Sequence, residues 1–178
     1  MELGRRQIIG ALNLARLRVT LPLQVAAICY RLCSNGDGDN IEFLLVQTSG
    51  SRRKWTFPKG APSQRLSNPE AAAREAREEA GAFGRIERRH FHHYVHSKAV
   101  AGEPEGTQEF VVRAFLLEVR RVKAPQEFRR NPTWFSAAEA RRALSQGRQA
   151  KYRDELVSVV DRAMDRLQML RRSSAAAK

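Results

Sequence analysis

The segment from Ser67 to Gly81, SNPEAAAREAREEAG, constrains the fold of this chain more than any other stretch. Ser67 is followed three residues later by Glu70, the pattern of an N-terminal capping box, and Gly81 is a typical helix terminator. The residues between them favour helix, and nearly all of the uncharged ones are alanine. Because alanine lets a helix lie very close to a neighbouring layer, we predict that this helix packs on a β-sheet.

Short apolar runs on both sides of this helix have the composition of strands. We expect strands at 25–33, 41–47, 85–96, 109–121 and Thr133–Phe135, with a short WTF strand at 55–57. Ser136 and Glu139 form a second capping box, and the apolar residues of a final helix, 150–171, recur at helical spacing. This order of strands and helices predicts an α/β sandwich, with a central mixed sheet and helices on both faces.

The chain of 178 residues is long enough for one domain with its own core. We expect an N-terminal lead-in over 1–22, the domain over 23–171 and a disordered tail over 172–178. No apolar run approaches the ~20 residues of a membrane-spanning helix, and no secretory signal is recognisable, although an Arg-rich transit peptide remains an alternative. Cys29 and Cys33 are expected to be reduced thiols, which favours a cytoplasmic location.

Three carboxylates, Glu75, Glu78 and Glu79, have the i, i+3, i+4 relation and therefore share one face of the predicted helix. Like charges placed together destabilise a helix unless positive charge joins them. Neighbouring arginines could supply that charge, and so could a divalent cation, because Mg²⁺ prefers carboxylate oxygens. The pattern alone leaves two interpretations open: a solvated charged face, and a metal site.

The loop before this helix is strongly basic, with no acidic residue between Gly50 and Arg65. Glycine lets a backbone approach a ligand closely, and lysine suits phosphate as a point charge. A basic, glycine-containing loop beside a carboxylate helix is the arrangement expected of metal-assisted phosphate chemistry. We therefore predict a phosphate-binding loop made of Arg52, Arg53, Lys54, Lys59 and Gly60.

The spacing of these features matches a known motif. Gly60 is followed fourteen residues later by Arg74, which opens the run REAREEAGA. This resembles the Nudix box, a glycine and an acidic residue followed by R-E-U-x-E-E-x-G-U, where U is apolar. The chain is most similar to diphosphoinositol polyphosphate phosphohydrolases and diadenosine polyphosphate hydrolases. The resemblance spans roughly Gln24 to Met164 and includes AAICYR, FLLVQTSGSRRKWTFPKG and TWFSAAEARRAL.

The resemblance implies a Nudix-like α/β/α sandwich and a pyrophosphohydrolase that uses Mg²⁺, with Mn²⁺ as the alternative ion. It implies that Glu75, Glu78 and Glu79 are catalytic and hold metal, and that Arg74 and Gly81 are structural. A further carboxylate completes such sites from outside the helix. Glu103, Glu105 and Glu109 are the candidates, and we select Glu109 because it begins a strand.

One position departs from the motif, because Leu66 stands where the family has its first glutamate. In the family that glutamate pairs with the motif arginine. Glu70 lies four residues before Arg74, the favoured orientation for a helical ion pair, so we hypothesise that Glu70 braces Arg74 instead. The departure also leaves open a non-catalytic binding module that keeps the box without turnover.

The charge of the chain bears on its substrate. A formal net charge of +13 and a pI of about 10.9 favour a small, highly phosphorylated substrate over a simple nucleoside triphosphate. Diphosphoinositol polyphosphates and diadenosine polyphosphates are the first expectation, and the 5′ end of RNA is the alternative. The histidines of 90–96 and the two tryptophans, Trp55 and Trp134, are expected to pack or lie partly exposed without a catalytic role. No membrane partner is expected, and the oligomeric state is not predicted.

Overall fold

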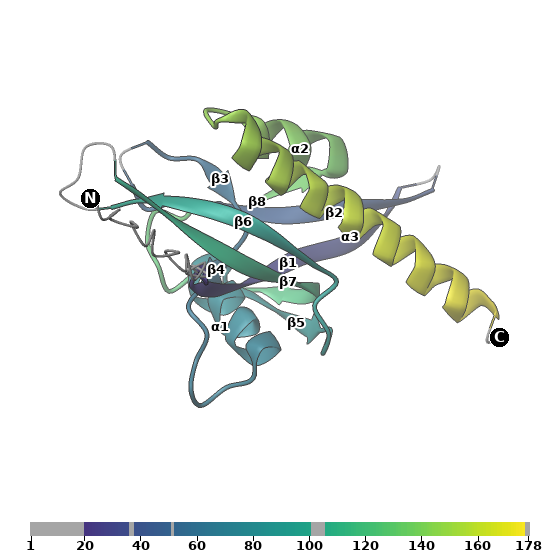
Figure 1. Ribbon diagram of the computed structural model, residues 1–178. Helices are drawn as coiled ribbons and strands as arrows, with labels where there is room; N and C mark the ends of the chain where they lie inside the picture. The colour runs from purple at the N-terminus through teal and green to yellow at the C-terminus, as the bar shows by residue number, and fades with distance from the viewer. Residues whose placement is uncertain (1–19, 36–37, 51, 101–105, 177–178) are drawn as a thin grey trace, which may run out of the picture.

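The computed structural model describes residues 20–35, 38–50, 52–100 and 106–176 (Figure 1). The chain order of strands is β1 (Leu23–Asn35), β2 (Gly38–Gln47), β3 (Trp55–Thr56), β4 (Lys59–Gly60), β5 (Ala82–Ile86), β6 (His92–Ala99), β7 (Thr107–Val122) and β8 (Thr133–Ser136). The helices are α1 (Asn68–Ala80), α2 (Ala137–Ser145) and α3 (Ala150–Ala176). None of the described helices is long and apolar enough to cross a membrane.

The described strands form one mixed sheet in the order β3-β2-β1-β7-β5. β1 and β7 run parallel at its centre, with Ala26 beside Ala114, and the remaining pairs are antiparallel. The remaining described strands pair alongside this path: β4 pairs with β1, β6 with β7 and β8 with β2. The expected mixed sheet is confirmed.

Helices cover both faces of the sheet, α1 on one and α2 with α3 on the other (Figure 1). The alanine side of α1 packs against β1 and β2, with Ala71, Ala72, Ala76 and Ala80 fully buried. The opposite face has a larger core in which Phe43, Tyr94 and Leu116 pack beneath α2 and α3. Because the apolar residues on the buried side of α1 are alanines, the backbone of α1 and the buried Glu75 and Glu79 come close to the strands.

Two boundaries differ from the sequence predictions. The strand expected at 85–96 is two strands, β5 and β6, which pair with opposite ends of β7 and are separated by residues 87–91. The disordered tail expected from residue 172 is also wrong for its first part, because α3 continues to Ala176. Alanine is the strongest helix former, which favours this extension. Residues 1–19 of the expected lead-in over 1–22, and residues 177–178, lie outside the described residues.

Candidate active site

β4 and α1 together form the centre of the candidate site. Gly60 in β4 lies directly against Glu75, and a Cβ at this position would overlap the Glu75 carboxylate. The backbone N–H of Lys59 donates to Oε2 of Glu79 at 3.2 Å. Glu75 and Glu79 are 8% and 4% exposed, so these two carboxylates are buried beneath this short strand.

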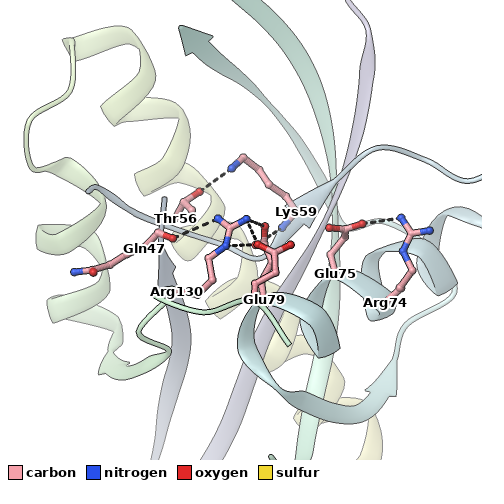
Figure 2. Close-up of polar contacts among 8 residues, drawn as sticks. Gln47, Thr56, Lys59, Arg74, Glu75, Glu79 and Arg130 are labelled. Atoms are coloured by element: carbon pink, nitrogen blue, oxygen red, sulfur yellow. Dashed lines mark hydrogen bonds and ion pairs between the residues drawn. The ribbon is translucent and has the colours of Figure 1, made fainter. Parts of the chain in front are cut away.

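Glu75, Glu78 and Glu79 are each paired with an arginine. Nη2 of Arg74 lies 2.7 Å from Oε1 of Glu75, and Nε of Arg74 lies 3.7 Å from Oε1 of Glu78. Glu79 instead pairs with Arg130, whose Nη2 lies 2.7 Å from Oε1 of Glu79. Figure 2 shows the two buried carboxylates directed at these two different arginines. Arginines therefore compensate the charge that the sequence pattern places on this face of α1.

Arg130 was not among the predicted site residues, and its position is tightly defined. Its Nε donates to Oε2 of Glu127 at 2.6 Å, and its Nη1 donates to the carbonyl oxygen of Gln47 at 3.4 Å. Its own carbonyl accepts from the Gln47 N–H at 2.6 Å. The residues on either side, Arg129 and Asn131, have φ angles of 68° and 48°. A non-glycine residue rarely adopts this left-handed conformation, so the loop maintains a costly backbone at this point.

Glu127 is the carboxylate that the structure brings to the site from outside the helix. Besides its contact with Arg130, its backbone N–H donates to the carbonyl oxygen of Glu78 at 2.9 Å. Glu109, which we expected in this role, instead accepts from Lys151 Nζ at 2.6 Å and from the Tyr152 hydroxyl at 2.7 Å. That expectation is corrected, because the start of α3 holds Glu109 away from the carboxylates of α1.

The expected Glu70–Arg74 brace is also wrong. The backbone N–H and the hydroxyl of Ser67 both donate to Oε2 of Glu70, at 2.8 and 2.6 Å, so Glu70 caps its own helix. Arg74 reaches the preceding loop directly, with Nη2 3.5 Å from the carbonyl oxygen of Ala61. Gly81 ends α1 as predicted, with a φ of 63° that suits glycine at a helix C-terminus.

Burial in this site shifts the pKa values of Glu79 and Lys59. Burial raises the pKa of Glu79 to about 7, and the positive charges of Lys59 and Arg130 oppose this rise. Burial lowers the pKa of the Lys59 ammonium to about 8, and Glu79 opposes that change. Glu79 can therefore exchange a proton near neutral pH, which is a property of catalytic carboxylates.

The basic side chains of the predicted phosphate loop lie in two separate regions of the structure. Arg53 reaches the Gln47 side chain at 3.5 Å and, with Arg129, lines a cavity of about 220 Å³ beside residues 48–50. Arg52 is exposed nearby, and Lys54 lies between these arginines and β3. Lys59 points elsewhere: its Nζ donates to Oγ1 of Thr56 at 3.2 Å, and Figure 2 shows this side chain running away from Glu79.

The carboxylates present fit a divalent metal ion by their chemistry. Glu75, Glu78 and Glu79 offer the carboxylate oxygens that hard cations prefer, and Gly60 leaves room where a side chain would collide with Glu75. Across the described ranges, however, no group of three or more His, Cys, Asp or Glu side chains is arranged to hold an ion. A metal would therefore take over the charge compensation that Arg74 and Arg130 supply here.

Known structures share this fold. C. elegans diadenosine tetraphosphate (Ap4A) hydrolase, as a binary complex, is 22% identical, with a TM-score of 0.58 over 83% of this chain and 98% of that one. A candidate asymmetric diadenosine tetraphosphate hydrolase from Jonesia denitrificans is 19% identical, with a TM-score of 0.58 over 82% and 96% of the two chains. The NUDIX domain of Shewanella oneidensis NrtR, complexed with ADP ribose, is 17% identical, with a TM-score of 0.57 over 83% and 89%.

These low identities establish a similar fold and nothing more. The assignment to a family rests on the match of this sequence to a domain family. Residues 22–156 match the NUDIX domain, and this range covers most of the chain and contains every residue of the site described above. Nudix hydrolases generally use divalent metal ions, and the carboxylates on α1 are of the kind that such ions need. A NUDIX domain supports the expectation that this protein is an enzyme, a pyrophosphohydrolase. The chain belongs to the NUDIX family.

Proposed function

We propose that this protein is a metal-dependent pyrophosphohydrolase that cleaves a phosphoanhydride bond in a highly phosphorylated small molecule. Diadenosine polyphosphates and diphosphoinositol polyphosphates are the proposed substrates, and Mg²⁺ is the proposed ion, with Mn²⁺ able to replace it. The observation that carries the proposal is the burial of Glu75 and Glu79 beneath Gly60, next to the basic residues of the same loop. The free thiols, Cys29 and Cys33, fit the reducing cytoplasm in which we expect it to act.

In this proposal the carboxylates of α1 have separate roles. Glu78 and Glu79 hold the metal, and Glu75 orients or deprotonates the attacking water or serves as a further ligand. When bound, the ion supplies charge neutralisation at the phosphates and lowers the pKa of bound water. Arg74 positions Glu75 and the loop at Ala61, and Arg53 and Lys59 contact phosphates that do not react.

Charge supports the choice of substrate. The described site residues from the loop and from 127–131 are mostly cationic, and the whole chain carries a formal net charge of +13. A substrate with many phosphates would gain more from this field than a substrate with few. The similarity of fold to an Ap4A hydrolase is consistent with a dinucleoside polyphosphate, but at 22% identity it does not select one.

The experiment measures hydrolysis of a panel of substrates by the wild-type protein, by a site variant and by a control variant. The substrates are diadenosine hexa- and tetraphosphate, a diphosphoinositol polyphosphate, ADP-ribose, a nucleoside triphosphate and 5′-triphosphorylated RNA, each with Mg²⁺ and with EDTA. The variant Glu78→Gln/Glu79→Gln removes two carboxylates from the site, and Asp154→Asn/Asp165→Asn removes two charges from α3 as a matched control.

We expect metal-dependent cleavage that the control keeps and the site variant loses by several orders of magnitude. Preference for a dinucleoside or inositol substrate would support the proposal, and preference for RNA would replace that substrate with the RNA 5′ end. If a folded wild-type protein binds these substrates with metal but cleaves none of them, the enzyme proposal is refuted. The protein would then be a non-catalytic binding module.

A further inference from the structure

The edge of the sheet at β5 has an open cavity of about 510 Å³. β5 is the last strand of the sheet order, and among the described strands it pairs with β7 alone (Figure 1). The residues that line the cavity come from these two strands, and none of them belongs to the candidate active site. They are Phe83, Gly84, Arg85, Arg120 and Arg121.

A β-bulge directs the two arginines of β7 into the same cavity. The register between β5 and β7 shifts between Phe83 and Gly84, which leaves Arg120 as an extra residue in β7. Regular alternation would send adjacent side chains to opposite faces of the sheet, but a bulge re-aims a side chain. Arg120 and Arg121 therefore line one cavity together, and Arg85 joins them from β5.

Positive charge exceeds negative charge at this cavity. Oε2 of Glu118 lies 3.7 Å from Nε of Arg85 and 4.0 Å from Nη2 of Arg120. These two arginine side chains are 76% and 67% exposed, so such long contacts stabilise them little. Arg121 has no ion pair among the residues that the structure describes. Three further exposed cations lie within three residues of the ends of β5 and β7: Arg88, Arg89 and Lys123.

Phe83 adds an aromatic ring to these cations. It is half-buried, and it packs against neither of the two cores that the described residues form. The guanidinium carbon of Arg121 lies 5.0 Å from the centroid of the ring, and Nζ of Lys123 lies 5.7 Å from it. Proteins that bind single strands combine an aromatic ring, on which a base stacks, with cations that follow the phosphates. The same two elements lie together at this edge of the sheet.

We propose that Phe83, Arg85, Arg120 and Arg121 form a docking surface for single-stranded nucleic acid. The planar guanidinium groups match phosphates in charge and geometry, and arginine also stacks on bases. A cavity of about 510 Å³ lies within the usual range of small-ligand pockets, so it has room for one nucleotide. An acidic peptide would match the charge of this surface but would leave the aromatic ring without a role.

Docking at this surface does not depend on the proposed function, because it uses neither the carboxylates of α1 nor a metal. We would therefore measure binding in EDTA, by fluorescence anisotropy of labelled oligouridylate and oligothymidylate over a series of salt concentrations. Both probes have a 5′-hydroxyl end and so contain no phosphoanhydride bond. Polyglutamate of similar length, measured in the same way, represents an acidic peptide.

Two variants test the two elements of the surface, and a third is the control. Arg85→Gln/Arg120→Gln/Arg121→Gln removes three charges, and Phe83→Leu removes the aromatic ring but keeps an apolar side chain. The matched control removes three exposed cations from α2 and the start of α3, so it lowers the net charge equally. It is Arg142→Gln/Lys151→Gln/Arg153→Gln. Melting temperatures establish that each variant is folded.

We expect the wild-type protein to bind both oligonucleotides with an affinity that falls as salt is added. Each phosphate contact of a single strand contributes about −0.7 to the slope of log affinity against log salt. The triple variant should therefore reduce the steepness of this slope by about 2 and weaken binding at least about tenfold. Phe83→Leu should weaken binding about fivefold with the slope unchanged, because it removes stacking and no charge. The control should stay close to the wild type.

Four results would overturn the docking surface. These are no binding by the wild type at low salt, equal weakening in the control, wild-type affinity in a folded Phe83→Leu, and polyglutamate bound as tightly as the oligonucleotides. Hydrolysis of the small substrates with Mg²⁺ is measured separately, and the triple variant should retain the wild-type kcat and KM. If the oligonucleotides bind as expected but no substrate is hydrolysed, the surface stands and the proposed function fails. If a substrate is hydrolysed but no oligonucleotide binds, the enzyme stands and the surface is refuted.

Discussion

Replacing Arg130 with methionine tests how the site tolerates a buried carboxylate. The Arg130 and Glu79 side chains are 14% and 6% exposed, and their closest atoms are 2.7 Å apart. For unit charges ~4 Å apart and an effective dielectric constant of ~20, the attraction is about 4 kcal/mol. If Glu79 kept its charge, the variant would lose stability by about this amount, as is usual when one partner of a buried ion pair is removed.

Glu79 can avoid most of this loss by binding a proton. Burial already raises its pKa to about 7 with Arg130 in place. At pH 8 the protonated form is therefore only about 1.4 kcal/mol less stable than the ionised form, and at pH 6 it already predominates. Since Arg130 stabilises the ionised form alone, the loss due to charge is limited to about 1.4 kcal/mol at pH 8 and is close to zero at pH 6.

The hydrogen bonds of Arg130 to Glu127 and Gln47 add about 1 kcal/mol at either pH. Urea unfolding in EDTA should therefore give a destabilisation of about 1 kcal/mol at pH 6 and about 2.5 kcal/mol at pH 8. Arg129→Met is the control, since Arg129 is the exposed neighbour of Arg130 in the same loop. A loss near 4 kcal/mol that is the same at both pH values would refute the reasoning, because Glu79 would then remain ionised without its partner.

Three further substitutions test the site and its supports. Gly60→Ala should lower kcat by on the order of 10² while changing the melting temperature little, because the new Cβ displaces only the flexible end of Glu75; unchanged kcat would contradict this. Glu70→Ala should cost about 1 kcal/mol in urea unfolding and leave kcat unchanged, since Glu70 caps α1 and contacts no site residue; a loss of activity at full stability would restore it to the site. Gly84→Ala should cost about 3 kcal/mol or more, because a Cβ in this β-bulge would overlap the backbone of Glu118; near-wild-type stability would show that the bulge relaxes.

The features that the sequence predicted best are those that local geometry determines. Helix periodicity alone brings Glu75, Glu78 and Glu79 together, and it places Glu75 and Glu79 on the same buried side of α1 as the alanines. The buried alanines then bring α1 against β1, and Gly60 in β4 provides the space for Glu75. The carboxylates of α1 and the meeting of Gly60 with Glu75 both lie within about one helix length in the sequence, a range in which spacing is informative.

The features that the sequence did not predict depend on contacts between distant segments. Arg130 and Glu127 lie in a loop with no periodicity, about 50 residues after the carboxylates that they meet. The left-handed backbone beside Arg130 occurs at Arg129, a residue type that gives no signal for it. Glu109 was selected because it begins a strand, but its partners in α3 lie more than 40 residues away. The signal that could have favoured Glu127 is its i, i+3 relation to Arg130 directly before a strand.

Leu66 shows how a departure from a motif can be interpreted physically. A leucine at this position cannot pair with Arg74, and the pattern alone suggested a weakened junction between loop and helix. In the structure Leu66 packs against the apolar core beneath α1, and Arg74 reaches the loop at Ala61 and the carboxylate of Glu75. Apolar contact and a backbone hydrogen bond thus attach the loop to the helix in place of an ion pair. Because the junction is kept by other means, the leucine by itself is no argument for a box that binds without turning over.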